Sequence, residues 1–121
     1  MANEKIMEAE AEEVFEPETA ESADTYIHSF NKPFTFEGVT YNTLTFNWGK
    51  LTGHDAELIE MELQARGKII ISPEFSGTYL MCMAARACEE KLPSDGFAAL
   101  PLADYNRIRS RARSFLLNSA S

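Results

Sequence analysis

Few residues of this 121-residue chain could do acid–base, nucleophilic or metal chemistry, and their spacing favours none of those roles. The histidines are His28 and His54, and neither has a cysteine or a second histidine at metal-ligand spacing. We interpret His54 and the adjacent Asp55 as a solvated pair in the first turn of a helix. The sequence also lacks a phosphate-cradling glycine pattern and a serine in a nucleophile-elbow context. We therefore expect a protein that is not an enzyme and that uses no cofactor or metal.

The two cysteines, Cys82 and Cys88, lie six residues apart in what reads as one helix. That spacing places them on different faces, so we expect free thiols of the kind found in a reducing cytosol. The longest apolar run, residues 75–88, contains Arg86 and is shorter than the roughly 20 residues that span a bilayer. The N-terminus has no apolar stretch of the secretory type. We expect a soluble, intracellular protein that does not contact a membrane.

Four arginines near the C-terminus could contact phosphates. Arg107 and Arg111 lie on one flank of a predicted helix, and Arg109 and Arg113 lie on the other. However, the net charge of −8 resides entirely in residues 1–24, and residues 25–121 sum to zero. An acidic segment repels nucleic acid, so we expect no nucleic-acid partner. The arginines are better explained by the favourable interaction of cations with a helix C-terminus.

The same charge distribution divides the chain into two parts. Residues 1–24 hold nine acidic side chains, one lysine and few large apolar groups. Such a segment cannot bury enough apolar surface to offset its ordering entropy. We expect it to be a disordered acidic tail, with at most a frayed helix around residues 8–15. Residues 25–121 then form a single domain with one modest core.

A β-hairpin is predicted at the start of this domain. Aromatic and β-branched residues alternate with polar ones around Glu37-Gly38, which indicates strands near 33–37 and 39–47 and an irregularity near Asn42. A lone hairpin is not stable in water, so helices must cover one of its faces. We expect its apolar residues (Phe34, Phe36, Tyr41, Leu44, Phe46) to pack against two helical stripes (Ile59 and Leu63; Tyr105, Ile108 and Phe115).

Three helices are predicted after the hairpin. Thr52 caps the first, with Asp55 in a capping-box position, and Gly67 ends it. Residues 68–71 are a buried connector or an extra strand. Ser72-Pro73 begins the second helix, which runs towards Leu92, and Pro101 opens the last, which ends near Leu117. The predicted fold is α+β: an N-terminal hairpin on a small bundle of about three helices.

The second helix is the unusual one, because Arg86 is its only charge between Phe75 and Cys88. A helix that is apolar all round is either buried on all sides or keeps a stripe exposed for a partner. Both readings stay open. For the second, we expect a helix-in-groove contact that uses Tyr79, Met83 and the Arg107/Arg111 flank, first in a homo-oligomer and then with a client.

In order and spacing these pieces resemble a known family. The stretch Lys32–Phe46, with Pro33, Phe36, Gly38, Tyr41 and Leu44, is similar to the opening of small tail assembly chaperones of long-tailed bacteriophages. The ending from Leu100 through Asp104 to Phe115 is similar as well, so the resemblance covers about residues 28–117. Two features depart from the pattern: the acidic residue after the hairpin is displaced to Asp55, and residues 1–24 have no counterpart.

The resemblance implies a non-enzymatic chaperone. Members of that family bind the helical, aggregation-prone tape-measure protein, help recruit tail-tube subunits in the host cytoplasm, and are absent from the mature virion. Two other classes stay open. One is a virion structural or connector protein, and the other is an inhibitor of a host enzyme that uses residues 4–24 to mimic nucleic acid.

Overall fold

The computed structural model describes residues 24–119, and its elements confirm the predicted α+β class. Two strands, β1 (Thr25–Phe36) and β2 (Val39–Asn47), precede four α-helices. The helices are α1 (Gly53–Ala65), α2 (Gly77–Ala87), α3 (Ser94–Ala98) and α4 (Leu102–Ser119). Short 3-10 helices cover Trp48–Lys50 and Pro73–Phe75. The prediction for the acidic tail falls almost wholly on residues 1–23, which lie outside the described residues.

The two strands pair antiparallel, from Thr25 opposite Asn47 to Phe36 opposite Val39. Glu37 and Gly38 form the turn with φ values of 50° and 83°, as two-residue hairpin turns with the twist of the strands require. The first strand begins earlier than the predicted position near residue 33. The predicted irregularity near Asn42 is present: Asn42 lies between Thr43 and Tyr41, which pair with Ser29 and Phe34, and the extra residues lie in β1 between Ser29 and Phe34. That stretch contains Pro33, which has no N–H to donate to a ladder.

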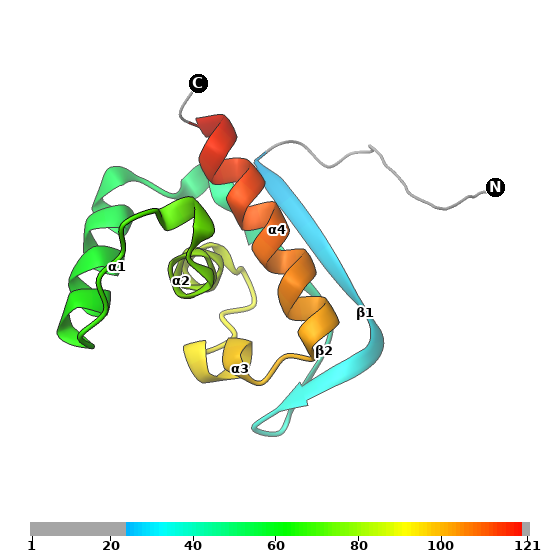
Figure 1. Ribbon diagram of the computed structural model, residues 1–121. Coiled ribbons are helices and arrows are strands. Elements are labelled where there is room, and N and C mark those ends of the chain that lie inside the picture. Colours follow the sequence, from blue (N-terminus) through cyan, green and yellow to red (C-terminus); the bar gives the residue numbers. More distant parts are fainter. Residues whose placement is uncertain (1–23, 120–121) are drawn as a thin grey trace.

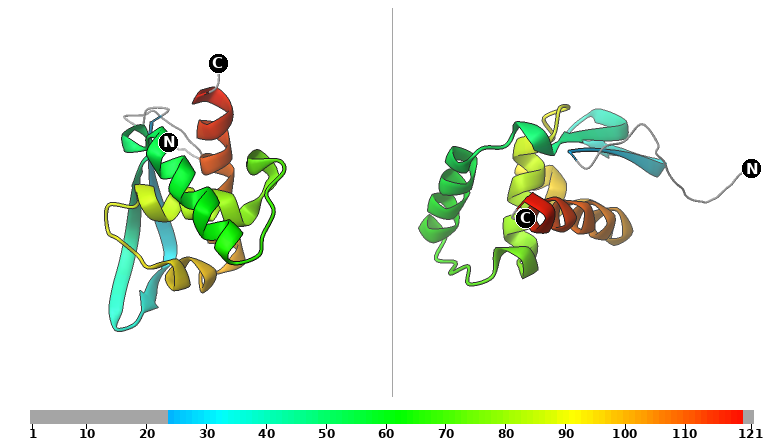
Figure 2. Two further views of the ribbon diagram at one scale, coloured as in Figure 1. Left: turned by 90° about the vertical axis from the view of Figure 1, so that its left-hand side faces the viewer. Right: turned by 90° about the horizontal axis from the view of Figure 1, so that it is seen from above.

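The helices cover one side of the hairpin with α2 at the centre. Figure 1 shows α4 crossing over the hairpin beside α2, and α1 on the far side of α2. Figure 2 shows the same arrangement from two further sides. The hairpin therefore does not pack directly against the α1 stripe of Ile59 and Leu63, as predicted, because α2 lies between them. Leu44 and Phe46 are fully buried, whereas Phe34, Phe36 and Tyr41 are half-buried at the edge of the core.

Stacked rings connect the hairpin to α4. Phe46 stacks on Trp48 with ring centroids 5.2 Å apart, and Trp48 stacks on Phe115 at 6.2 Å. Phe46 also meets Phe97 of α3 at 6.1 Å. Together with Ile108 and Ala112 of α4 and the apolar side of α2, these rings belong to one continuous core.

Helix starts follow local capping chemistry. The capping box of α1 is present as predicted: the Thr52 N–H donates to Asp55 Oδ2 at 2.8 Å. The start of α2 differs from the prediction, because Ser72-Pro73 opens only a 3-10 turn. Ser76 then adopts an extended conformation and its Oγ accepts the N–H of Tyr79 at 3.1 Å, which makes Ser76 the cap of α2.

The end of α2 also differs from the prediction. The helix stops at Ala87, and Cys88 has an extended backbone that forms an isolated bridge with Phe46. The predicted continuation to Leu92 is wrong because the chain turns here to pair with β2. Ser94–Ala98, predicted as a turn and a link, forms the short helix α3.

Candidate functional site

The four predicted partner-binding residues belong to two helices: Tyr79 and Met83 to α2, and Arg107 and Arg111 to α4. The two pairs lie on different sides of α4. Tyr79 and Met83 are buried, with 4% and 5% of their surface exposed. The large apolar side chains of α2 pack against α1, α4 and the hairpin side of the core. The exposed apolar stripe that was one of the two readings of this helix is therefore absent. Arg107 and Arg111 are exposed on the flank of α4 that faces β1.

Tyr79 and Met83 nevertheless line a cavity with a volume of about 240 Å³. It lies between the start of α1, the middle of α2 and the end of α4. Its apolar lining comes from all three helices, and its polar residues are at the α1 start and the α4 end. The full lining is Leu51, Thr52, Gly53, Asp55, Ala56, Ile59, Tyr79, Met83, Phe115, Leu116 and Ser119. A space of this size and character suits one or two apolar side chains of a partner.

The charged group at this cavity is already engaged. Asp55 accepts from the backbone N–H of Thr52 and from Arg86 Nε, the latter at 2.7 Å. The Thr52 hydrogen bond, followed by that from Arg86, lowers the pKa of the Asp55 carboxyl. The carboxylate therefore holds the start of α1 to α2 and keeps the cavity mouth in place.

Arg107 and Arg111 have partners within the chain. Arg107 Nη2 donates to Asp104 Oδ1 at 3.1 Å. The Arg111 guanidinium carbon lies 4.5 Å from the ring centroid of Tyr26, in a cation–π contact. Arg111 thus connects α4 to β1, whereas Arg107 is paired within α4, and the structure does not bring either arginine together with Tyr79 and Met83.

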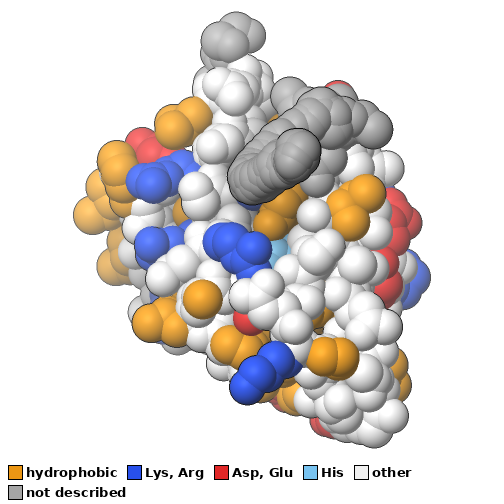
Figure 3. Space-filling view, turned by 90° about the vertical axis from the view of Figure 1, so that its right-hand side faces the viewer, with side chains coloured by type: hydrophobic (Ala, Val, Ile, Leu, Met, Phe, Trp, Pro, Cys, Tyr) orange, Lys and Arg blue, Asp and Glu red, His pale blue; other side chains and the backbone are white. Residues whose placement is uncertain are grey.

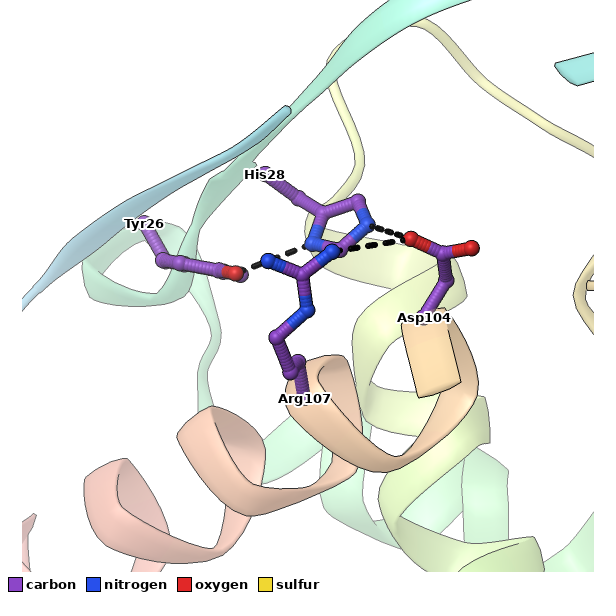
Figure 4. A network of polar contacts seen from close by, with 4 residues as sticks. All are labelled: Tyr26, His28, Asp104 and Arg107. Carbon is purple, nitrogen blue, oxygen red and sulfur yellow. Dashed lines mark hydrogen bonds and ion pairs between the residues drawn. The ribbon is translucent and has the colours of Figure 1, made fainter. Parts of the chain in front are cut away.

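A buried polar network at the β1–α4 contact was not predicted from the sequence (Figure 4). His28 Nε2 lies 2.8 Å from Asp104 Oδ1, and Tyr26 Oη lies 2.9 Å from His28 Nδ1. Because a carboxylate only accepts, Nε2 carries the proton and Nδ1 accepts from the tyrosine hydroxyl. Burial lowers the pKa of His28, against the raising effect of the Asp104 hydrogen bond and with a smaller lowering effect from Arg107.

This network has the connectivity of a catalytic triad, but its burial favours a structural role. His28 has no exposed surface and Tyr26 is 7% exposed, so a dissolved substrate cannot reach the imidazole or the hydroxyl. Its effect is to fix the register of β1 against α4. Two sequence patterns could have indicated this network. Tyr26, His28 and Phe30 alternate as residues on one face of a strand do, and Asp104, Arg107 and Arg111 have the spacing of one helical face.

The connector between α1 and α2 is exposed. Ile69, Ile71 and Phe75 are 87%, 88% and 73% exposed, and residues 68–72 belong to no helix or strand. The sequence prediction of a buried connector or an extra strand is wrong. No β-strand lies beside this segment to pair with it in the described part of the chain, whose sheet holds β1 and β2.

The remaining chemistry-bearing residues do not converge. Within residues 24–119, no three His, Cys, Asp or Glu side chains gather as a metal site would require. Cys82 and Cys88 are free thiols, and burial raises the pKa of both, which disfavours the reactive thiolate. None of the described helices combines the length and the hydropathy needed to cross a bilayer.

Comparison of the chain with protein-family models, with curated proteins and with solved structures finds no significant match. The resemblance of residues 28–117 to phage tail assembly chaperones therefore stays a prediction.

Proposed function

We propose that this protein is a bacteriophage tail assembly chaperone that binds a helical segment of the tape-measure protein and helps recruit tail-tube subunits. The observation that carries the proposal is the apolar cavity between α1, α2 and α4, which Tyr79 and Met83 line. An amphipathic helix docks by inserting apolar side chains into such a space. The motif resemblance, with its hairpin, apolar helix and Arg-rich last helix, supplies the identity of the client.

In this proposal the protein acts without catalysis, cofactor, nucleic acid or membrane. It assembles with itself before the client arrives, works in the host cytoplasm while tails form, and is absent from the finished particle. Arg111 contributes indirectly, because its contact with Tyr26 of β1 holds α4 in the position that shapes one wall of the cavity, and Arg107 supports Asp104 within the same helix.

The test fills the cavity without unfolding the protein. Ala56 is a half-buried lining residue on α1, so Ala56→Leu places three more carbon atoms in the space that the client side chain would occupy. Ala103→Leu, at an exposed position on α4, is the matched control. Each full-length variant is co-expressed with segments of a phage tape-measure protein, and co-purification is measured.

We expect the wild type and Ala103→Leu to retain the tape-measure segment and Ala56→Leu to lose it, with equal circular dichroism spectra. Failure of the wild type to capture any segment would overturn the proposal. Recovery of the protein from purified mature particles would instead support the connector alternative. Inhibition of a host nucleic-acid enzyme that disappears when residues 4–24 are neutralised would support the inhibitor alternative.

A further inference from the structure

The connector between α1 and α2 presents a concentrated apolar surface. Ile69, Ile71 and Phe75 are all more than 70% exposed and lie within seven consecutive residues. Single exposed apolar side chains are ordinary, but a group of large ones marks a surface that another segment covers. We call these three residues, with the cations beside them, the connector surface.

Cations border these side chains. The Arg113 guanidinium carbon lies 5.8 Å from the ring centroid of Phe75, and the Arg109 side chain lies beside Gly77 at the start of α2. Lys68, directly before Ile69, is exposed. Figure 3 shows hydrophobic side chains next to Lys and Arg side chains along the left edge of the molecule. The matching occupant is a segment with apolar side chains on one face and acids around them.

Residues 1–23 of this chain have that composition. They contain eight glutamates and one lysine, and Met7, Ala11, Val14 and Phe15 follow the i, i+4, i+7, i+8 spacing of one helical face. Pro17 limits such a helix to the residues before it. A segment of this kind buries too little of its own surface to fold alone, but it can order on contact with a complementary surface.

The described part of the chain begins close enough for the segment to reach. The carbonyl of Asp24 accepts the N–H of Gly49 at 3.2 Å, and the neighbouring Trp48 stacks on Phe115. Arg113, two residues before Phe115 in α4, lies over the ring of Phe75. The route from Asp24 to the connector surface therefore crosses one helix, about 10 Å wide. The nine residue-to-residue steps from Phe15 to Asp24 span up to about 30 Å when extended.

We propose that residues 1–23 dock on the connector surface of their own chain, with Met7, Val14 and Phe15 on the apolar side chains and the glutamates facing Arg109, Arg113 and Lys68. The contact is intramolecular. It covers an apolar surface that would otherwise associate with other molecules, and it is separate from the cavity assigned to the tape-measure helix.

A glutamate-specific protease tests the contact in the full-length protein, because docking protects the glutamates of residues 1–23. Phe75→Ser should accelerate cleavage after Glu10 by at least about tenfold, since it removes the central aromatic anchor. Leu102→Ser is the matched control, because Leu102 is 72% exposed and Phe75 is 73% exposed. Its cleavage rate should equal that of the wild type.

A second variant approaches the contact from the other side. Ile71→Ser should repeat the effect of Phe75→Ser, and Phe15→Ser combined with Phe75→Ser should cleave no faster than Phe75→Ser alone, because both changes break one contact. Wild-type cleavage rates in Phe75→Ser and Ile71→Ser would overturn the proposal. Protection that disappears on dilution would also overturn it, since it would identify a second copy as the source of the covering segment. Neither readout involves the tape-measure protein.

Discussion

His28 and Asp104 form a buried hydrogen bond between β1 and α4, with Nε2 and Oδ1 2.8 Å apart and 76 residues between them in sequence. A buried polar group without a partner costs about 1–3 kcal/mol, so this bond selects the arrangement in which both groups are satisfied. Because Arg107 donates to the same carboxylate oxygen, the arrangement also fixes one turn of α4.

The first prediction follows from the lowered pKa of His28. The unfolded imidazole titrates near its ordinary value of 6.5, whereas the folded one takes up a proton only at lower pH. Its contribution to stability is therefore complete above the unfolded pKa and is lost as the pH falls towards the folded pKa. Urea unfolding between pH 5 and 8, a range set about the ordinary pKa of histidine, should show stability rising with pH.

The matched control uses the second histidine. His28→Gln should abolish that pH dependence and lower stability, because it disrupts the contacts with Tyr26 and Asp104. His54→Gln, at an exposed position, should leave the wild-type pH dependence unchanged. A His28→Gln protein with the wild-type profile would show that His28 does not titrate as described.

The second prediction compares two methionines. Met83 is 5% exposed and Met61 is 64% exposed. Met83→Ser should cost about 2–5 kcal/mol, since it removes a buried apolar side chain and places a hydroxyl in the core. Met61→Ser should stay within about 0.5 kcal/mol of the wild type. Chemical denaturation measures both, and equal stabilities would contradict the burial of Met83.

The sequence predicted the parts of the fold that local chemistry controls. The Glu37-Gly38 turn and the Thr52/Asp55 capping box depend on neighbouring residues, and the structure contains both. The start of α2 was predicted wrongly because the sequence offers two serines, Ser72 and Ser76, either of which could cap the helix. Packing decides between them: a Cβ at Gly77 would lie 2.6 Å from Tyr105 Oη, so the helix starts where glycine permits contact with α4.

Long-range pairings were not predictable in the same way. In the sequence, a histidine at an inward-facing strand position interrupts the series of apolar residues. The hydrogen bond to Asp104, which only the fold reveals, explains why His28 can be buried there. Likewise, the apolar character of α2 could not distinguish burial from an exposed stripe, because the answer depends on how α1 and α4 cover it. The predicted site residues therefore separated: Tyr79 and Met83 line a cavity, whereas Arg107 and Arg111 face β1.

The third prediction concerns the hairpin core. Phe46 has no exposed surface and stacks on Trp48, whereas Phe36 is half-buried at the edge of the core. Phe46→Ala should cost about 3–5 kcal/mol, and Phe36→Ala should cost clearly less because part of its ring already contacts water. Thermal and urea unfolding give both values. An unchanged stability for Phe46→Ala would exclude the hairpin from the core.

The fourth prediction compares two glycines in helices. A Cβ on Gly96 would lie 2.7 Å from Cγ of Leu92, which is itself 2% exposed and cannot move into solvent. Gly96→Ala should therefore destabilise the protein by about 1–3 kcal/mol through overpacking. A Cβ on Gly53, at the start of α1, meets no atom within 4 Å, so Gly53→Ala should stabilise by about 0.4–1 kcal/mol through the reduced entropy of the unfolded chain. Urea denaturation of the two variants beside the wild type measures both signs. If Gly96→Ala were as stable as Gly53→Ala, the close approach of α3 to Leu92 would be wrong, and with it the packing of Phe97 against Phe46.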